Sequence, residues 1–115
     1  MDRIRHLRRL LPALALVVLA ACGGGPDLDT AAPVPGVTEV SMRGSQFTPP
    51  AIEVRAGTTV TWQFDDGDTQ HNVVAADFES PTQSEGTFTH TFTGPGTTDY
   101  RCTLHGQMRG RVVVR

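Results

Sequence analysis

Apolar and polar side chains alternate along short runs through the chain from Val37 onward. The alternation is clearest in residues 87–93, where two Phe and one His share one face and four Thr share the other. Residues 58–64 show the same period, with Val, Trp and Phe on one side. A period of two is typical of β-strands with one buried face. No apolar pattern of helical period is long enough to predict a helix.

Turns that contain Gly and Pro separate the candidate strands. Seven runs qualify: Thr38–Met42, Ile52–Arg55, Thr58–Phe64, His71–Val74, Thr87–Thr93, Thr97–Cys102 and Arg111–Arg115. Short strands with turn signals at intervals of roughly 8–12 residues are typical of sandwiches. We therefore predict an all-β domain, a two-sheet Greek-key sandwich of about seven to eight strands. Residues 75–85 are its least regular stretch.

The first 21 residues differ from the rest of the chain. Four Arg precede an apolar run from Leu10 to Ala21, which ends in small residues. This is the pattern of an export signal, and the run is shorter than the roughly 20 residues that a membrane-spanning helix needs. We therefore assign residues 1–21 to a signal peptide and expect an exported protein.

The end of this signal, Leu19-Ala20-Ala21-Cys22, resembles the bacterial lipoprotein box, in which the cysteine becomes the lipidated first residue. The alternative is an ordinary signal peptide that is cut nearby. Lipid on Cys22 would anchor the protein on the extracytoplasmic side of a bacterial membrane, in the periplasm or at the cell surface. Cys102 would then be a lone thiol in an oxidising compartment rather than half of a disulfide, so it must be shielded or used.

The segment that follows Cys22 is rich in Gly and Pro and has almost nothing apolar enough to bury. We expect residues 22–36 to comprise the lipidated Cys22 and a flexible linker, with a reach of roughly 20 Å. Residues 37–115 are then the single folded domain, because a chain of 115 residues has room for only one core.

The charge of the chain excludes one class of partner. Residues 1–21 contain four of the ten Arg and one of the twelve acidic residues, so the mature chain keeps six and eleven, a net charge near −5. The chain contains no Lys. Nucleic-acid binding requires clustered positive charge, so we expect no nucleic-acid partner.

Three potential metal ligands occur at successive spacings of three: the thiol of Cys102, the imidazole of His105 and the thioether of Met108. Copper that cycles between Cu(I) and Cu(II) is typically held by two His and one Cys, with a weak axial Met. His71, at the start of a predicted strand, supplies the second imidazole. We therefore predict one copper ion bound by His71, Cys102, His105 and Met108, with residues 103–109 as a loop between two strands.

Other chemistries fit these residues less well. A catalytic Cys–His pair would need a base, an orienting group and an oxyanion hole around a substrate pocket, and the sequence suggests none of these. Structural zinc sites usually have four Cys or His ligands, and the cluster has three. The mature chain has three His, too few for an oxygen-reducing copper cluster, so we expect no enzyme. The acidic residues 65–68 lack the later Glu of a calcium loop and are expected to form a solvated turn.

With these motifs, residues 37–115 resemble the plastocyanin and amicyanin group of cupredoxins. The pattern Cys-x-x-His-x-x-Met followed by Arg-Gly-Arg-Val-Val-Val is similar to the amicyanin ligand loop, and Phe47-Thr-Pro and Gly57-Thr-Thr-Val-Thr-Trp also match the group. The resemblance implies a blue-copper protein that carries one electron between extracytoplasmic redox partners, such as a cytochrome, a dehydrogenase or an oxidase. It also implies a monomer.

The same resemblance implies further roles. Asn72 would join the two ligand loops by hydrogen bonds, and Leu104, His105 and Gln107 would form the electron-transfer patch. Leu104 and Gly106 stand where amicyanins have Pro, so these positions supply N–H groups that Pro lacks. Two other classes remain open from the residues alone: a module that delivers or stores copper, and a metal-free interaction sandwich.

Overall fold

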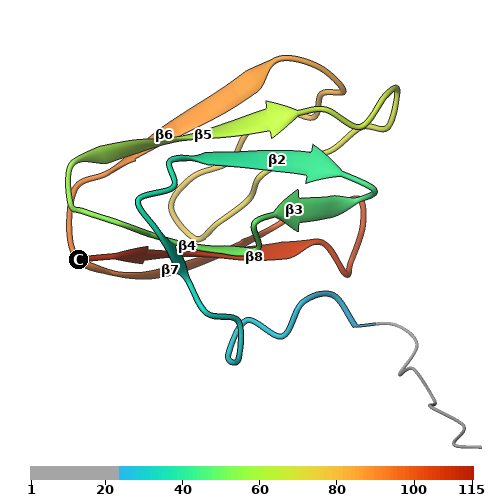
Figure 1. Cartoon of the computed structure of the whole chain (residues 1–115). Coiled ribbons are helices and arrows are strands. Elements are labelled where there is room, and N and C mark those ends of the chain that lie inside the picture. Colours follow the sequence, from blue (N-terminus) through green and yellow to red (C-terminus); the bar gives the residue numbers. More distant parts are fainter. Residues whose placement is uncertain (1–23) are drawn as a thin grey trace, which may run out of the picture.

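The protein is a sandwich of two four-stranded β-sheets in the computed structural model, which describes residues 24–115 (Figure 1). The predicted signal peptide and Cys22 lie outside the described residues. No helix occurs in residues 24–115, and accordingly none there is long and apolar enough to cross a membrane. The all-β fold is thus confirmed.

Eight strands make up the two sheets. In chain order they are β1 (Val34–Pro35), β2 (Glu39–Arg43), β3 (Gln46–Thr48), β4 (Ala51–Val54), β5 (Thr58–Phe64), β6 (Thr87–Phe92), β7 (Gly96–Arg101) and β8 (Arg109–Val114). One sheet has the order β1-β4-β8-β7 and the other β3-β2-β5-β6. Both sheets mix parallel and antiparallel pairs, because β4 runs parallel to β8 and β2 runs parallel to β5.

Six of the seven predicted strands are found within two residues of their expected ends. The seventh prediction, His71–Val74, is wrong, because this segment makes only single bridges to Gln83, Glu79 and Arg101. Three consecutive residues of the segment, His71, Asn72 and Val73, are buried, so it runs through the interior rather than along one face of a sheet. A strand with one exposed face would bury every second residue.

The core lies between the facing sides of the two sheets. Trp62 at its centre is fully buried, and its ring centroid lies 5.3 Å from that of Tyr100 in the opposite sheet. Burying a large apolar side chain contributes about 1.5–3 kcal/mol, so the aromatic contacts across the sandwich are a main source of its stability. His90 is half-buried and stacks on Phe78 with the centroids 4.0 Å apart, which agrees with a packing role.

The chain's connections place the predicted ligands at one end of the sandwich. The long connection from β5 to β6 and the loop from β7 to β8 both lie at the end seen on the right in Figure 1. The C-terminus lies at the other end. The sandwich therefore acts as a frame that holds two ligand-bearing loops side by side.

Residues 24–36 pack on the domain, whereas the sequence analysis expected a flexible linker there. Val34 and Pro35 form β1, which pairs with the edge of β4. Further upstream, the Arg111 guanidinium donates to the Leu28 carbonyl at 2.9 Å. The reason for the difference is that backbone pairing and the half-buried Arg111 hold the segment, and neither contact requires an apolar pattern in the sequence.

Replacement of Gly110 by Ala is expected to destabilise the fold. A Cβ on buried Gly110 would overlap the ring of Tyr100, which lies directly opposite on β7. Overpacking of this kind costs about 1–3 kcal/mol of the free energy of unfolding, measured by urea denaturation of the metal-free protein. Gly94→Ala is the control, because a Cβ there meets nothing within 4 Å. Equal stability of the two variants would contradict this packing.

Candidate metal centre

Three of the four predicted ligands converge at one end of the sandwich. Potential ligand atoms of His71, Cys102 and His105 all lie within 4.8 Å of one another. Cys102 directly follows β7, His105 lies three residues further along the same loop, and His71 comes from the β5–β6 connection. His71 and Cys102 are buried, whereas His105 is half-buried. The site therefore reaches from the interior to the surface through His105.

Hydrogen bonds occupy one nitrogen of each imidazole and leave the other for a metal. His71 Nε2 donates to Asp66 Oδ2 at 2.8 Å, while its Nδ1 lies 3.8 Å from the sulfur of Cys102. His105 Nε2 donates to the Gln70 carbonyl at 3.3 Å. This arrangement selects Nδ1 as the ligand atom of both rings, because a metal-bound His typically donates its other N–H to a protein acceptor.

The loop that carries Cys102 is closed on itself by its backbone. The Cys102 N–H donates to the Met108 carbonyl at 2.9 Å, and the Met108 N–H donates to the His105 carbonyl at 2.9 Å. Met108 is fully buried and is available as a fourth ligand. Two imidazoles, a thiol and a thioether form the donor set that copper takes when it cycles between its two oxidation states. The residues present therefore fit one copper ion.

Asn72 joins the two ligand-bearing segments. Its side-chain amide donates to Thr103 Oγ1 at 2.8 Å, and its carbonyl oxygen accepts the Thr103 N–H at 2.8 Å. Asn72 follows the ligand His71, and Thr103 follows the ligand Cys102. The paired hydrogen bonds fix the spacing of these two ligands whether or not a metal is bound.

Asp66 is a functional residue that the sequence analysis missed, because it was expected to lie in a solvated turn. Besides His71, its carboxylate accepts the N–H groups of Ser45 at 2.9 Å and Gly44 at 2.9 Å. The hydrogen bonds from Ser45 and His71, and then that from Gly44, lower the pKa of Asp66 despite some burial. The charged carboxylate thus ties His71 to the β2–β3 turn. A carboxylate five residues before a predicted ligand His was the only available signal.

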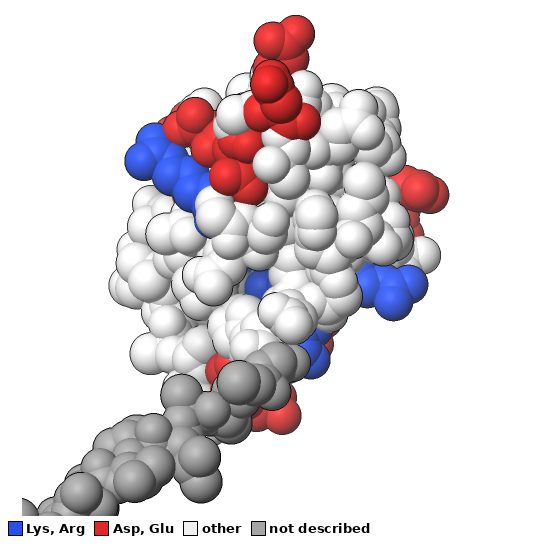
Figure 2. Space-filling model, turned by 90° about the vertical axis from the view of Figure 1, so that its right-hand side faces the viewer, with Lys and Arg blue, Asp and Glu red and all other residues white. Residues whose placement is uncertain are grey.

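The surface around His105 is poor in charge. Leu104 is one of the two exposed large hydrophobic side chains of residues 24–115, at 44%, and Gln107 is also exposed. Figure 2 shows this end of the molecule, where uncharged side chains fill the centre and acidic side chains gather at the upper edge. A small apolar patch with a half-buried imidazole suits brief contact with another protein.

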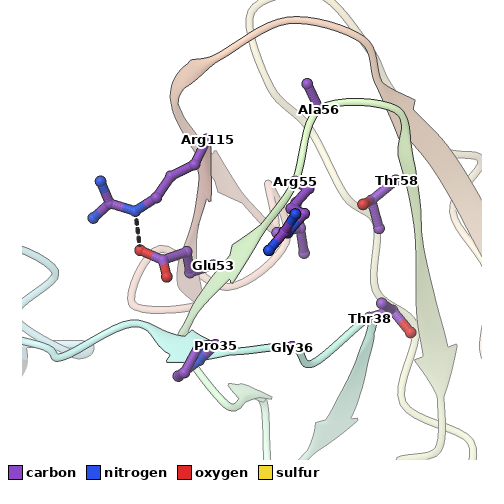
Figure 3. Close-up of a pocket in the computed structure, with 9 residues that line it drawn as sticks. Pro35, Gly36, Thr38, Glu53, Arg55, Ala56, Thr58 and Arg115 are labelled. Atoms are coloured by element: carbon purple, nitrogen blue, oxygen red, sulfur yellow. Dashed lines mark hydrogen bonds and ion pairs between the residues drawn. The ribbon is translucent and has the colours of Figure 1, made fainter.

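A pocket at the far end of the sandwich takes no part in this centre. It is lined by residues of β1, β4 and β5 and their connections together with Arg115, whose guanidinium pairs with Glu53 on one side of it (Figure 3). None of the four predicted ligands is among the lining residues. This pocket is therefore separate from the metal centre.

Comparisons with known proteins agree with this site. The copper binding proteins of the plastocyanin/azurin family match residues 35–115. Amicyanin-alpha of Methylorubrum extorquens is 36% identical over 120 residues, which cover 94% of this chain and 99% of that protein. A purple cupredoxin from Nitrosopumilus maritimus superposes with a TM-score of 0.63 at 28% identity, covering 69% of this chain and 100% of that one. A reduced amicyanin variant gives a TM-score of 0.61 at 35% identity, covering 70% and 83%.

Removal of the Asp66 carboxylate is expected to weaken metal binding. In Asp66→Ala, His71 loses the acceptor that orients its ring, and loss of such a partner typically lowers metal affinity by about 10–100-fold. Titration against a Cu(I) chelator measures the affinity. Asp68→Ala is the matched control, since Asp68 is exposed. Unchanged affinity in Asp66→Ala would show that the ring needs no such support.

Proposed function

The chain belongs to the plastocyanin/azurin family of copper-binding proteins, and on that basis we propose that His71, Cys102, His105 and Met108 together bind its single copper ion. The protein is a blue-copper electron-transfer protein and not an enzyme. The convergence of three ligand atoms within 4.8 Å is the observation that carries the assignment of the site. We further propose that its redox partners lie outside the cytoplasm and include a cytochrome, a dehydrogenase or an oxidase.

The support for fast electron transfer is the rigidity of the ligand frame. Cu(I) and Cu(II) prefer different geometries, so a site that is held fixed rearranges little when an electron enters or leaves. Asp66 holds His71 from one side, and Asn72 holds the loop of Cys102 from the other. These contacts involve protein groups alone, so neither depends on the metal itself.

The support for His105 as the route of the electron is its position. Its ring is half-buried between the interior ligands and the uncharged surface, and its centroid lies 4.9 Å from that of His71. Leu104 and Gln107 lie beside it in the sequence and are exposed. We infer that a partner docks on the patch formed by Leu104, His105 and Gln107 and exchanges the electron through the imidazole.

The burial of Cys102 distinguishes a carrier from a thiol enzyme. The side chain is 1% exposed, so no substrate reaches its sulfur without opening of the fold. A reactive catalytic thiol is partly exposed in an electropositive setting. Burial beside two imidazoles instead protects the thiol against oxidation and leaves it available to copper.

Export and lipid anchoring form a separate part of the proposal. Its support is the signal pattern of residues 1–21 followed by the lipoprotein box that ends at Cys22. The mature protein would then be held on the extracytoplasmic side of a bacterial membrane. This position suits exchange of electrons with partners that are themselves at the membrane.

Spectroscopy of the copper-loaded mature chain without lipid tests the assigned ligands. The wild type is expected to show an intense thiolate-to-Cu(II) absorption band, and Cys102→Ser is expected to lose it because the thiolate is the electron donor of that transition. His90→Gln is the control, since His90 packs against Phe78 away from the ligands, and it keeps the band. A wild type that stays colourless with copper, and whose melting temperature does not rise, would overturn the assignment.

Fractionation of cells tests the anchor. The wild type and Cys102→Ser are expected in the membrane fraction, while Cys22→Ala loses the site of acylation and leaves that fraction. Mass spectrometry of the N-terminal peptide measures the added lipid directly. An unmodified Cys22 in the mature wild type would refute the anchor and leave the copper site unaffected.

A further inference from the structure

Residues 24–31, here called the N-terminal arm, are attached to the outer face of the sheet β1-β4-β8-β7. A turn shapes the arm, in which Asp27 accepts the N–H of Asp29 on its side chain at 3.0 Å and the N–H of Ala31 on its carbonyl at 2.9 Å. The arm then joins β1 a few residues later. The turn at Asp27 and the pairing of β1 therefore fix the path of the arm over the domain.

Arg111 of β8 is the main contact of the arm. Its guanidinium donates to both carboxylate oxygens of Asp99 at 2.6 and 3.1 Å. It also donates to the Leu28 carbonyl at 2.9 Å and to Asp29 Oδ1 at 3.2 Å. The Arg111 side chain is 20% exposed. A bidentate pair with Asp99 fixes the guanidinium fork, and the remaining N–H groups are then positioned to hold the arm.

The beginning of the arm touches the copper-ligand loop. A Cβ built on Gly25 would overlap the carbonyl oxygen of Gln107, whereas one on Gly24 meets nothing within 4 Å. The backbone at Gly25 therefore lies directly against the loop between His105 and Met108. Cys22 is three residues away, so its attachment point lies at most about 11 Å from Gly25 even in a fully extended chain.

Two arginines without an acidic partner border the same loop. Arg101 ends β7, Arg109 begins β8, and the two are directly opposite each other in the register. Both are exposed, and neither forms an ion pair within residues 24–115. Like charges directly opposite each other on a sheet destabilise it, so an external anion is the natural partner of this pair. By the alternation of the strands, they share the outer face with Arg111.

We propose that the N-terminal arm holds the lipid attachment site beside the ligand loop and that Arg101 and Arg109 contact anionic lipid headgroups. The copper end of the domain then faces the membrane, and the carrier exchanges electrons with a redox centre at the membrane surface. The inference rests on the lipid anchor at Cys22 proposed above.

The charges at the copper end determine which side of it meets the lipid. Figure 2 looks onto the copper end, and acidic side chains gather at its upper edge. Asp65 and Asp68 follow β5 in the β5–β6 connection at this end, and both are exposed. An anionic membrane attracts the arginine pair and repels these carboxylates, so the arginine side of the copper end turns toward the lipid.

Paramagnetic relaxation in lipid nanodiscs tests the orientation. The acylated protein in its Cu(I) form is placed in discs that contain phosphatidylglycerol and a gadolinium-labelled headgroup lipid, and amide relaxation is measured by NMR. Residues 103–109 are expected to relax several-fold faster than residues 94–96, which lie at the opposite end of β7, about 20 Å away. Equal enhancement at both ends, or greater enhancement at residues 94–96, would overturn the inference.

Two matched comparisons separate the contributions of the arm and the arginines. Gly25→Val displaces the arm from Gln107 and is expected to reduce the difference in relaxation between residues 103–109 and residues 94–96. Gly24→Val is the control and is expected to leave this difference unchanged. The double variant Arg101→Gln, Arg109→Gln is expected to reduce the relaxation difference in discs that contain phosphatidylglycerol. In discs of phosphatidylcholine it is expected to match the wild type. No effect of Gly25→Val, or a lipid-independent effect of the double variant, would contradict the respective contact. Mass spectrometry of the N-terminus reports separately on acylation, so failure of the anchor is distinguished from failure of the orientation.

Discussion

The hydrogen bond between the Asp66 carboxylate and His71 Nε2 is the contact on which the arrangement of the metal centre depends. This hydrogen bond leaves Nδ1 of His71 directed toward Cys102. The Asp66 carboxylate is itself held by the β2–β3 turn. The position of an interior ligand is therefore set by a distant hairpin of the sandwich. Asn72 extends the same frame to the second loop through Thr103. The fold thus builds the geometry before any metal arrives, which suits an ion that must change its charge without moving its ligands.

The sequence predicted the parts of the molecule that repeat locally. Alternating apolar residues located six strands, and the spacing of Cys102, His105 and Met108 identified the ligand loop. Features held by long-range contacts were missed. Asp66 meets Gly44 across 22 positions of the chain, and Arg111 meets Leu28 across 83, so no local period marks either contact. The segment at His71 was assigned to a strand because its composition resembles one, although its side chains are buried on both sides.

Burial and exposure divide the site into a protected half and an accessible half. Cys102 and Met108 are enclosed, whereas His105 reaches the surface beside Leu104. This division shields the Cys102 thiol from oxidants and leaves His105 accessible to a redox partner. The N-terminal arm adds a second constraint, because it runs from the ligand loop over Arg111 to β1. The proposed lipid anchor and the electron-transfer patch would thereby lie at the same end of the domain.

The central claim is that one copper ion is held by the same two imidazoles and one thiolate in both oxidation states. X-ray absorption spectroscopy of the copper edge, recorded on the Cu(I) and Cu(II) forms, measures this coordination directly. The account predicts one short copper–sulfur contact and two copper–nitrogen contacts in each form, with little change in length between them. Absence of the short sulfur contact, or a different ligand set in the two forms, would contradict it.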